Sequence, residues 1–219
     1  MSDGDRGGTI PCFAHELVGG HPVDAETWRD VRRFREAERT RLVALRRAMT
    51  QADRAAQTAR VVEALDAALG CLAGRVVAAW WPIRGEMDLR GWMADAHAAG
   101  ARIALPAVVA KGSPLAFRPW RPGCAMVRGV WDIPVPDTAE AVVPEIVLAP
   151  LVGVDAGGFR LGNGGGYYDM TLAAMPALPR RVGIGQDFCA LPTIYPQPWD
   201  VPMDTVLLGD GRVAAHAPA

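Results

Sequence analysis

A nearly unbroken apolar run from residue 146 to residue 154 is the feature that most constrains how this chain can fold. Such a run predicts a strand that is buried on both faces of a sheet. The sequence Arg-Leu-Gly-Asn-Gly-Gly-Gly-Tyr-Tyr-Asp follows at residues 160–169, and helix-forming residues come next at 170–175. The order of strand, turn, glycine loop and helix is typical of an α/β protein whose sheet is covered by helices.

Strand and helix patterns alternate along the rest of the chain. Helices are expected at 28–49, 51–72 and 89–99, and strands at 76–81, 102–105, 115–120, 182–184 and 205–208. We therefore predict an α/β fold: a single domain with a central, largely parallel or mixed sheet that is flanked by helices on both faces. The domain is expected to span residues 28–210, after an N-terminal extension at 1–27 and before a C-terminal tail at 211–219.

The composition is that of an ordinary globular protein. Of the 219 residues, 50% are hydrophobic and 21% are charged, and the formal net charge is −1, so we expect neither a nucleic-acid partner nor an anionic membrane partner. No apolar run is long enough to span a membrane, and no secretory signal is visible. We expect a cytoplasmic protein.

The four cysteines share no metal-ligand spacing. Within the extension, Cys12, His15 and Glu16 resemble half of a metal site, but no second half is evident, and a segment that caps the domain is the favoured interpretation.

The glycine loop has the chemistry of an anion site. Glycines at 162, 164, 165 and 166 permit a tight bend whose backbone N–H groups point outward at the start of a helix, where phosphate is the usual ligand. Arg160 supplies a guanidinium suited to phosphate, and Asp169 supplies an oxygen ligand for Mg²⁺. The loop is neither a Walker A motif nor a dinucleotide fingerprint. The alternative is a surface loop without a ligand.

These residues belong to a longer series of motifs that resembles the 5-formyltetrahydrofolate cyclo-ligase family, also called methenyltetrahydrofolate synthetases. The motifs are residues 81–88 (Trp-Pro-Ile-Arg-Gly-Glu-Met-Asp), 104–108, 131–136 (Trp-Asp-Ile-Pro-Val-Pro), 147–169 and 200–206. They cover roughly residues 35–208 in the family's order, which makes the resemblance more specific than any single motif.

The resemblance implies an enzyme that uses ATP and Mg²⁺ to convert 5-formyltetrahydrofolate to 5,10-methenyltetrahydrofolate, as a monomer or weak homodimer. It implies catalytic roles for Arg160 and Tyr168, and metal ligation by Asp169 and Asp204. The folate is expected on Glu86, Trp131 and Tyr167. ATP is expected on Arg35, Arg39, Arg160, Gly162, Asn163, Gly164, Gly165, Gly166, Tyr167 and Tyr168.

Simpler interpretations stand beside these roles. Arg35 and Arg39 lie on one helix face and, taken alone, belong to a solvated basic surface with Arg32, Arg33, Arg46 and Arg47. Glu86 and Asp204 are also explained as turn residues, and Trp131 as core. The chain departs from common family patterns at Gly165, Met170 and Trp199. A nucleotide or folate binder without turnover, and a kinase or ligase acting on another small molecule, therefore remain as alternatives.

Overall fold

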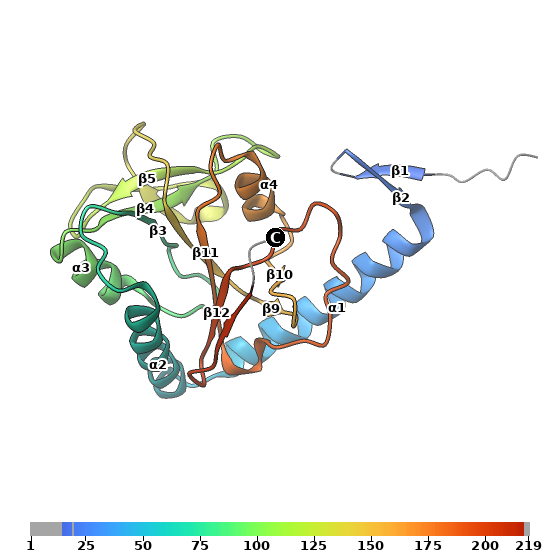
Figure 1. Cartoon of the computed structure of the whole chain (residues 1–219), viewed down its shortest axis with the longest axis horizontal. Coiled ribbons are helices and arrows are strands. Elements are labelled where there is room, and N and C mark those ends of the chain that lie inside the picture. Colours follow the sequence, from blue (N-terminus) through green and yellow to red (C-terminus); the bar gives the residue numbers. More distant parts are fainter. Residues whose placement is uncertain (1–14, 19, 217–219) are drawn as a thin grey trace, which may run out of the picture.

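The computed structural model describes residues 15–18 and 20–216, and its centre is a seven-stranded mixed sheet (Figure 1). The strand order is β13-β12-β11-β8-β3-β4-β5. The strands are β3 (Val76–Ala78), β4 (Arg102–Ala107), β5 (Ala116–Trp120), β8 (Ile146–Pro150), β11 (Arg180–Gly185), β12 (Thr205–Leu208) and β13 (Val213–Ala215). The five inner strands are parallel, whereas β5 and β13 are antiparallel edges. The predicted α/β class is confirmed.

Helices cover both faces of the sheet because successive strand residues point to opposite sides. In β8, Ile146 and Leu148 pack in one core cluster with residues of α2 (Gln51–Leu69) and α3 (Arg90–Ala98). The alternate residues Val147 and Ala149 pack in a second cluster beneath α4 (Tyr167–Ala174). Since both faces are buried, the strands read as continuous apolar runs in the sequence.

The N-terminal part forms a hairpin and a long helix that extend away from the sheet (Figure 1). Strands β1 (His15–Val18) and β2 (His21–Asp24) pair antiparallel, and α1 spans Ala25–Ala48. The Asp24 carboxylate caps the helix by accepting a bond of 2.8 Å from the Thr27 backbone N–H. The helix therefore begins inside the segment predicted as an extension, three residues before the expected start at 28.

Two other predicted boundaries differ from the structure. The run 146–154 is not one strand: β8 ends at Pro150, and β9 (Gly153–Val154) pairs with β10 (Arg160–Leu161) in a separate two-stranded sheet. The expected tail at 211–219 contributes β13 to the main sheet. Strands β6 (Met126–Arg128) and β7 (Pro134–Pro136) form another small hairpin, with the short helix η1 (Val130–Asp132) between them; a second one, η2 (Asp187–Cys189), follows β11. None of the described helices is both long and apolar enough to cross a bilayer.

The strand order reverses between β3 and β8. From β3 the chain builds outward through β4 to β5, and from β8 it builds in the other direction through β11 to β12. In an open parallel sheet, the loops at the carboxyl ends of two such strands diverge and leave a crevice where ligands bind. The topology alone therefore directs attention to the segments that follow Ala78 and Pro150.

Candidate active site

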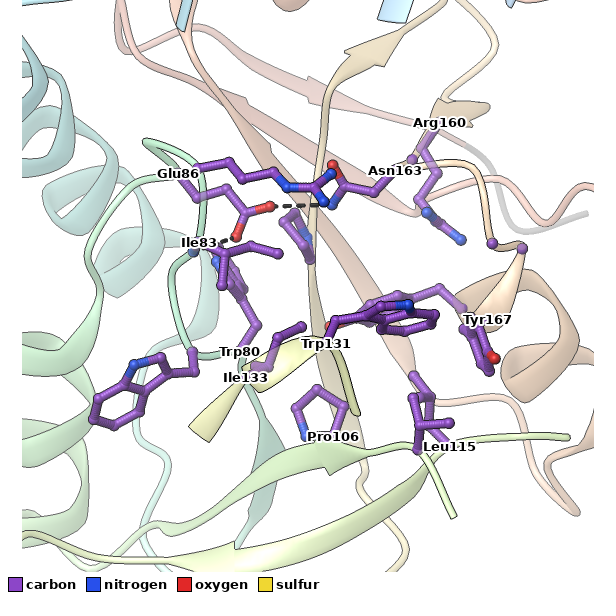
Figure 2. A pocket seen from close by; sticks show the side chains of 18 of the residues that line it. Trp80, Ile83, Glu86, Pro106, Leu115, Trp131, Ile133, Arg160, Asn163 and Tyr167 are labelled. Atoms are coloured by element: carbon purple, nitrogen blue, oxygen red, sulfur yellow. Dashed lines mark hydrogen bonds between the residues drawn. The ribbon is translucent and has the colours of Figure 1, made fainter. Parts of the chain in front are cut away.

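A cavity of about 360 Å³ lies at the carboxyl ends of β3, β4 and β8. Polar side chains of Glu86, Asn163 and Arg160 lie on one side of it, and apolar side chains lie on the opposite side (Figure 2). The lining residues are Trp80, Trp81, Ile83, Arg84, Glu86, Pro106, Val108, Leu115, Trp131, Ile133, Pro150, Arg160, Gly162, Asn163, Gly165, Gly166, Tyr167, Tyr168 and Asp169. A concave apolar site with a few converging polar groups is typical of small-molecule binding.

The glycine loop forms one wall and leads into α4. Gly166 caps the helix in a left-handed conformation with a φ of 65°, which glycine adopts without strain. Among the described residues, the backbone N–H groups of Gly164, Gly165 and Gly166 have no hydrogen-bond acceptor. Free N–H groups before a helix N-terminus are suited to bind an anion.

Arg160 and Asp169 form a buried ion pair at the edge of this loop. Arg160 Nη2 donates to Asp169 Oδ2 over 2.6 Å, and the Val201 backbone N–H donates to Asp169 Oδ1 over 3.2 Å. Burial raises the pKa of Asp169, and the Arg160 charge opposes this rise. Arg160 also lies over the ring of Tyr168, with its guanidinium carbon 5.0 Å from the ring centroid.

Glu86 lies on the polar side of the cavity, next to the glycine loop. Its carboxylate accepts hydrogen bonds from the Ile83 backbone N–H at 3.1 Å and from Asn163 Nδ2 at 3.2 Å (Figure 2). Burial raises the pKa of Glu86, while these two bonds and the charges of Arg46 and Arg84 act to lower it. The bond to Asn163 joins the segment after β3 to the glycine loop.

Two aromatic rings stand at the cavity mouth. Trp131 and Tyr167 meet edge to face with centroids 5.5 Å apart, and Trp131 is 62% exposed. A tryptophan that is this exposed does not belong to the core, so the alternative interpretation of Trp131 as a core residue is wrong. Trp131 also has a φ of 57°, which is unusual for a large side chain and places its ring at the mouth.

Buried polar atoms without partners concentrate at this cavity. Among the described residues, five buried side-chain atoms have no hydrogen-bond partner, and three of them belong to residues that line the cavity: Trp80 Nε1, Arg160 Nε and Tyr168 Oη. Burial raises the pKa of Tyr168, which keeps its hydroxyl protonated and able to donate. An unpaired buried donor costs roughly 1–3 kcal/mol, so this concentration indicates that a ligand completes the set.

Two arginines expected to bind ATP, Arg35 and Arg39, lie outside the cavity lining. Arg39 Nε donates to the Gly162 carbonyl oxygen over 2.8 Å, and the side chain lies behind Gly164. Arg35 donates to the carbonyl oxygens of Ile194 and Tyr195, both at 2.9 Å, and pairs with Asp200. Arg39 thus supports the loop, whereas the Arg35 guanidinium is engaged by another segment.

The structure does not bring Asp204 to the cavity. Its carboxylate pairs with Arg181 at the amino ends of β11 and β12, whereas the cavity lies at the carboxyl ends of the parallel strands. Burial acts to raise the pKa of Asp204, but the hydrogen bonds and charge of Arg181 and the charge of Arg180 together outweigh it, so the pKa is lowered. No group of three or more candidate metal ligands occurs in the described part of the chain. The expected Asp169–Asp204 pair therefore has no support in this geometry.

Three side chains shape the site in addition to those predicted from the sequence. Trp80 and Arg84 line the cavity, and their position directly after β3 would have indicated this. The expectation that Arg46 belongs to a solvated surface is wrong, because this side chain is buried beside Glu86. Cys12 of the Cys-x-x-His-Glu pattern lies outside the described residues.

Residues 31–209 match the model of the 5-formyltetrahydrofolate cyclo-ligase family. A 5-formyltetrahydrofolate cyclo-ligase of Mycolicibacterium smegmatis is 32% identical over 181 residues, which cover 77% of this chain and 90% of the relative. The Escherichia coli K12 protein of that name is 30% identical over 139 residues, which cover 60% and 76%.

Solved structures share the fold. The 5,10-methenyltetrahydrofolate synthetase of Aquifex aeolicus aligns with a TM-score of 0.71 at 23% identity, covering 84% of this chain and 94% of the other. That of Mycoplasma pneumoniae aligns with a TM-score of 0.64 at 21% identity, covering 78% and 96%.

Proposed function

Because the chain belongs to the 5-formyltetrahydrofolate cyclo-ligase family, we propose that its cavity converts 5-formyltetrahydrofolate to 5,10-methenyltetrahydrofolate, with cleavage of ATP to ADP and phosphate. The observation that supports this best is the cavity itself. It combines a glycine loop whose backbone N–H groups are free within the described residues, a buried carboxylate and an aromatic wall at the point where the strand order reverses.

ATP would supply the leaving group: transfer of its γ-phosphoryl group to the formyl oxygen lets that oxygen depart as phosphate when N10 attacks the formyl carbon. Arg160 and the free N–H groups of Gly164, Gly165 and Gly166 would hold the phosphate oxygens and stabilise charge that develops on them. Arg39 would act indirectly, because its bond to the Gly162 carbonyl fixes the loop. These groups position and stabilise charge, and none of them needs to act as a nucleophile.

The folate ring would lie between Glu86 and Trp131. The pterin edge carries N–H donors, and the Glu86 carboxylate retains acceptor capacity beyond its bonds to Ile83 and Asn163. Trp131 and Tyr167 offer flat faces at the cavity mouth. Trp80 Nε1 is a buried donor for an acceptor on the same ligand.

Mg²⁺ would be held chiefly by the phosphate oxygens of ATP and by Asp169. Mg²⁺ usually binds through one or two carboxylates plus phosphates and waters, so a single protein carboxylate beside an anion loop suits it. Asp169 lines the cavity beside Arg160, and its buried carboxylate has capacity for a cation. Asp204 is committed to Arg181, so we assign it no metal role in this proposal.

The test is to incubate the full chain with 5-formyltetrahydrofolate and MgATP while following the absorbance of the methenyl product. Product formation that requires ATP and releases one phosphate per ring closed is the expected result. Binding of both ligands without product would identify a binder that lacks turnover. ATP cleavage that is stimulated by a different small molecule, and not by this folate, would identify another ligase or kinase.

A further inference from the structure

Arg46, in the last turn of α1, is a charged side chain that is only 2% exposed. Its Nε donates to the carbonyl oxygen of Arg84 over 3.1 Å, and its Nη1 lies 3.8 Å from Glu86 Oε1. Its Nη2 is buried with no partner in the described structure. The guanidinium therefore sits directly behind the carboxylate that faces the cavity.

A buried guanidinium is a costly way to fill space. Desolvation of an ion is repaid only when its partners are close and well aligned, and an apolar side chain of similar volume often packs as well or better. Within the described residues, the Arg46 guanidinium makes one hydrogen bond and one ion pair at the long end of the range, so packing stability alone does not account for its burial. A role that depends on the charge and the N–H donors of Arg46 does account for its burial.

The loop that Arg46 contacts contains two consecutive residues with positive φ angles. Arg84 and Gly85 are both left-handed, with φ values of 49° and 79°, and a Cβ at Gly85 would meet the Arg46 carbonyl oxygen at 3.3 Å. Arg46 holds the carbonyl of Arg84, and Gln186 Nε2 donates to the carbonyl of Gly85 over 3.2 Å. These two bonds fix the turn that carries Glu86 into the cavity.

We propose that Arg46 is a positioning residue for the folate half of the site: it holds the Arg84-Gly85 turn and presents the Glu86 carboxylate to the substrate. The inference rests on the proposed function only in naming the folate as the ligand of Glu86. Arg46 does not line the cavity, so it acts through Glu86 and not by contact with the substrate.

The charge of Arg46 also bears on the protonation of Glu86. The charged or titratable groups that face this carboxylate are Arg46 from α1, Arg84 from its own turn and Tyr168 from α4, and Asn163 is its neutral partner. The two arginine charges lower the pKa of Glu86 against the effect of burial. Removing Arg46 should therefore raise the pKa of Glu86 and leave less carboxylate at a given pH.

The experiment compares Arg46→Met with Arg47→Met in the full chain. Arg47 is the neighbouring arginine of the same helix turn and is exposed, so it is the matched control. Arg46→Met should raise KM for 5-formyltetrahydrofolate roughly tenfold or more, the fold-change of weakening one charge-assisted hydrogen bond, with KM for ATP changed by no more than about twofold. The acidic limb of the pH profile of kcat/KM should move to higher pH. Arg47→Met should change neither.

Arg46→Lys covers the case in which Arg46→Met does not fold. Lysine keeps the charge and loses the planar fork, so it should leave the pH profile near that of wild type while it raises KM for the folate by a smaller factor. Equal changes in both KM values, or an unchanged pH profile in a folded Arg46→Met protein, would show a merely structural role and overturn the proposal.

A second readout does not depend on turnover. The Glu86 carboxyl can be titrated by carbon NMR in glutamate-labelled protein, with its signal assigned by its absence in Glu86→Gln. We expect its pKa to rise in Arg46→Met and to stay in place in Arg47→Met. A pKa that does not move overturns the inference even when wild type converts the folate. A pKa that moves in protein without cyclo-ligase activity supports it and rejects the proposed function alone.

Discussion

Two arginine–aspartate pairs, Arg160–Asp169 and Arg181–Asp204, use the same chemistry with different outcomes. Both arginines are buried, with side chains 4% and 5% exposed. Asp204 receives the backbone N–H of Arg181 at 2.7 Å together with its Nε at 3.1 Å and its Nη2. Arg160 Nε has no partner among residues 15–18 and 20–216, and Asp169 lines the cavity. The Arg181–Asp204 pair, whose hydrogen bonds link the two segments, holds β11 and β12 together. Within the described part of the chain, the Arg160–Asp169 pair retains a free donor and therefore has capacity for a ligand.

The pKa directions of the two carboxyls reflect this difference. Burial is the largest influence at both carboxyls, and at Asp169 it raises the pKa. At Asp204 the hydrogen bonds and charge of Arg181, together with the charge of Arg180, outweigh burial and lower the pKa. Raised pKa values with an identifiable cause are common at functional sites, and lowered ones are common in structural ion pairs. The pKa directions therefore distinguish Arg160–Asp169, a candidate ligand-binding pair, from Arg181–Asp204, a structural ion pair, without reference to sequence motifs.

The largest expected effect comes from Arg160→Lys, with Arg181→Lys as the matched control. Lysine keeps the charge but loses the planar fork, so turnover should fall roughly 100-fold or more while ATP affinity changes less. Arg181→Lys should leave the kinetic constants of the folded protein near wild type. Steady-state turnover and nucleotide titration on one preparation give both numbers. Retained turnover with collapsed ATP affinity would make Arg160 a ground-state anchor and not a catalytic residue.

Asp169→Asn tests the metal side of the comparison. If Asp169 is the protein ligand of Mg²⁺, the Mg²⁺ concentration for half-maximal activity should rise about tenfold or more, the scale of losing one charged contact. Asp204→Asn should leave this concentration unchanged. A magnesium titration at saturating ATP measures both. An effect of Asp204→Asn equal to that of Asp169→Asn would restore Asp204 as a second ligand.

Asp204→Asn should instead lower stability. Removing one partner of a fully buried pair costs about 3–5 kcal/mol, but the Asp204 side chain is 21% exposed and solvent replaces part of the loss. We expect the free energy of unfolding at neutral pH to fall by about 1–2 kcal/mol. Urea denaturation followed by far-UV circular dichroism checks this. An unchanged free energy of unfolding would show that the Arg181–Asp204 pair does not stabilise the fold.

The smallest expected effect is on the pH dependence of stability: the free energies of unfolding of the two variants, relative to wild type, should change with pH in opposite directions. The lowered pKa of Asp204 gives stability that is present above the ordinary carboxyl range and is lost as pH falls through the folded-state value. The raised pKa of Asp169 gives stability that is present in acid and is lost as pH rises through its folded-state value. From about pH 3 to pH 7, Asp204→Asn should therefore become less stable relative to wild type, and Asp169→Asn more stable. Slopes of the same sign would contradict the assigned directions.

The sequence predicts much of the fold because its signals are local. The apolar runs at 76–81 and 146–154 each contain an observed inner strand, and the run at 102–105 lies within β4. The residues after the glycine loop form α4 as expected. The β1–β2 hairpin also has a local signal in the sequence, because two glycines between short runs favour a two-residue turn. Motifs predict Glu86 and Arg160 as site residues, and both line the same cavity.

The remaining parts depend on contacts between distant segments. Arg35 and Asp200 are 165 positions apart, so no helix periodicity predicts their ion pair. Arg46 follows the same charged pattern as its exposed neighbour Arg47, but it is buried where the Gly85 turn approaches it closely. Asp204 matched a motif, but its side chain is directed by Arg181 on the adjacent strand.

The reversal of strand order between β3 and β8 also fixes when the site can exist during synthesis. A growing chain that ends before residue 146 already contains Arg46 and Glu86, yet lacks Asn163, which lies 77 positions beyond Glu86. One wall of the cavity is thus translated long before the other, and only the insertion of β8 beside β3 brings them together. Substrate can therefore stabilise the completed sheet, but it cannot assist the part of the chain before residue 146 while that part emerges from the ribosome.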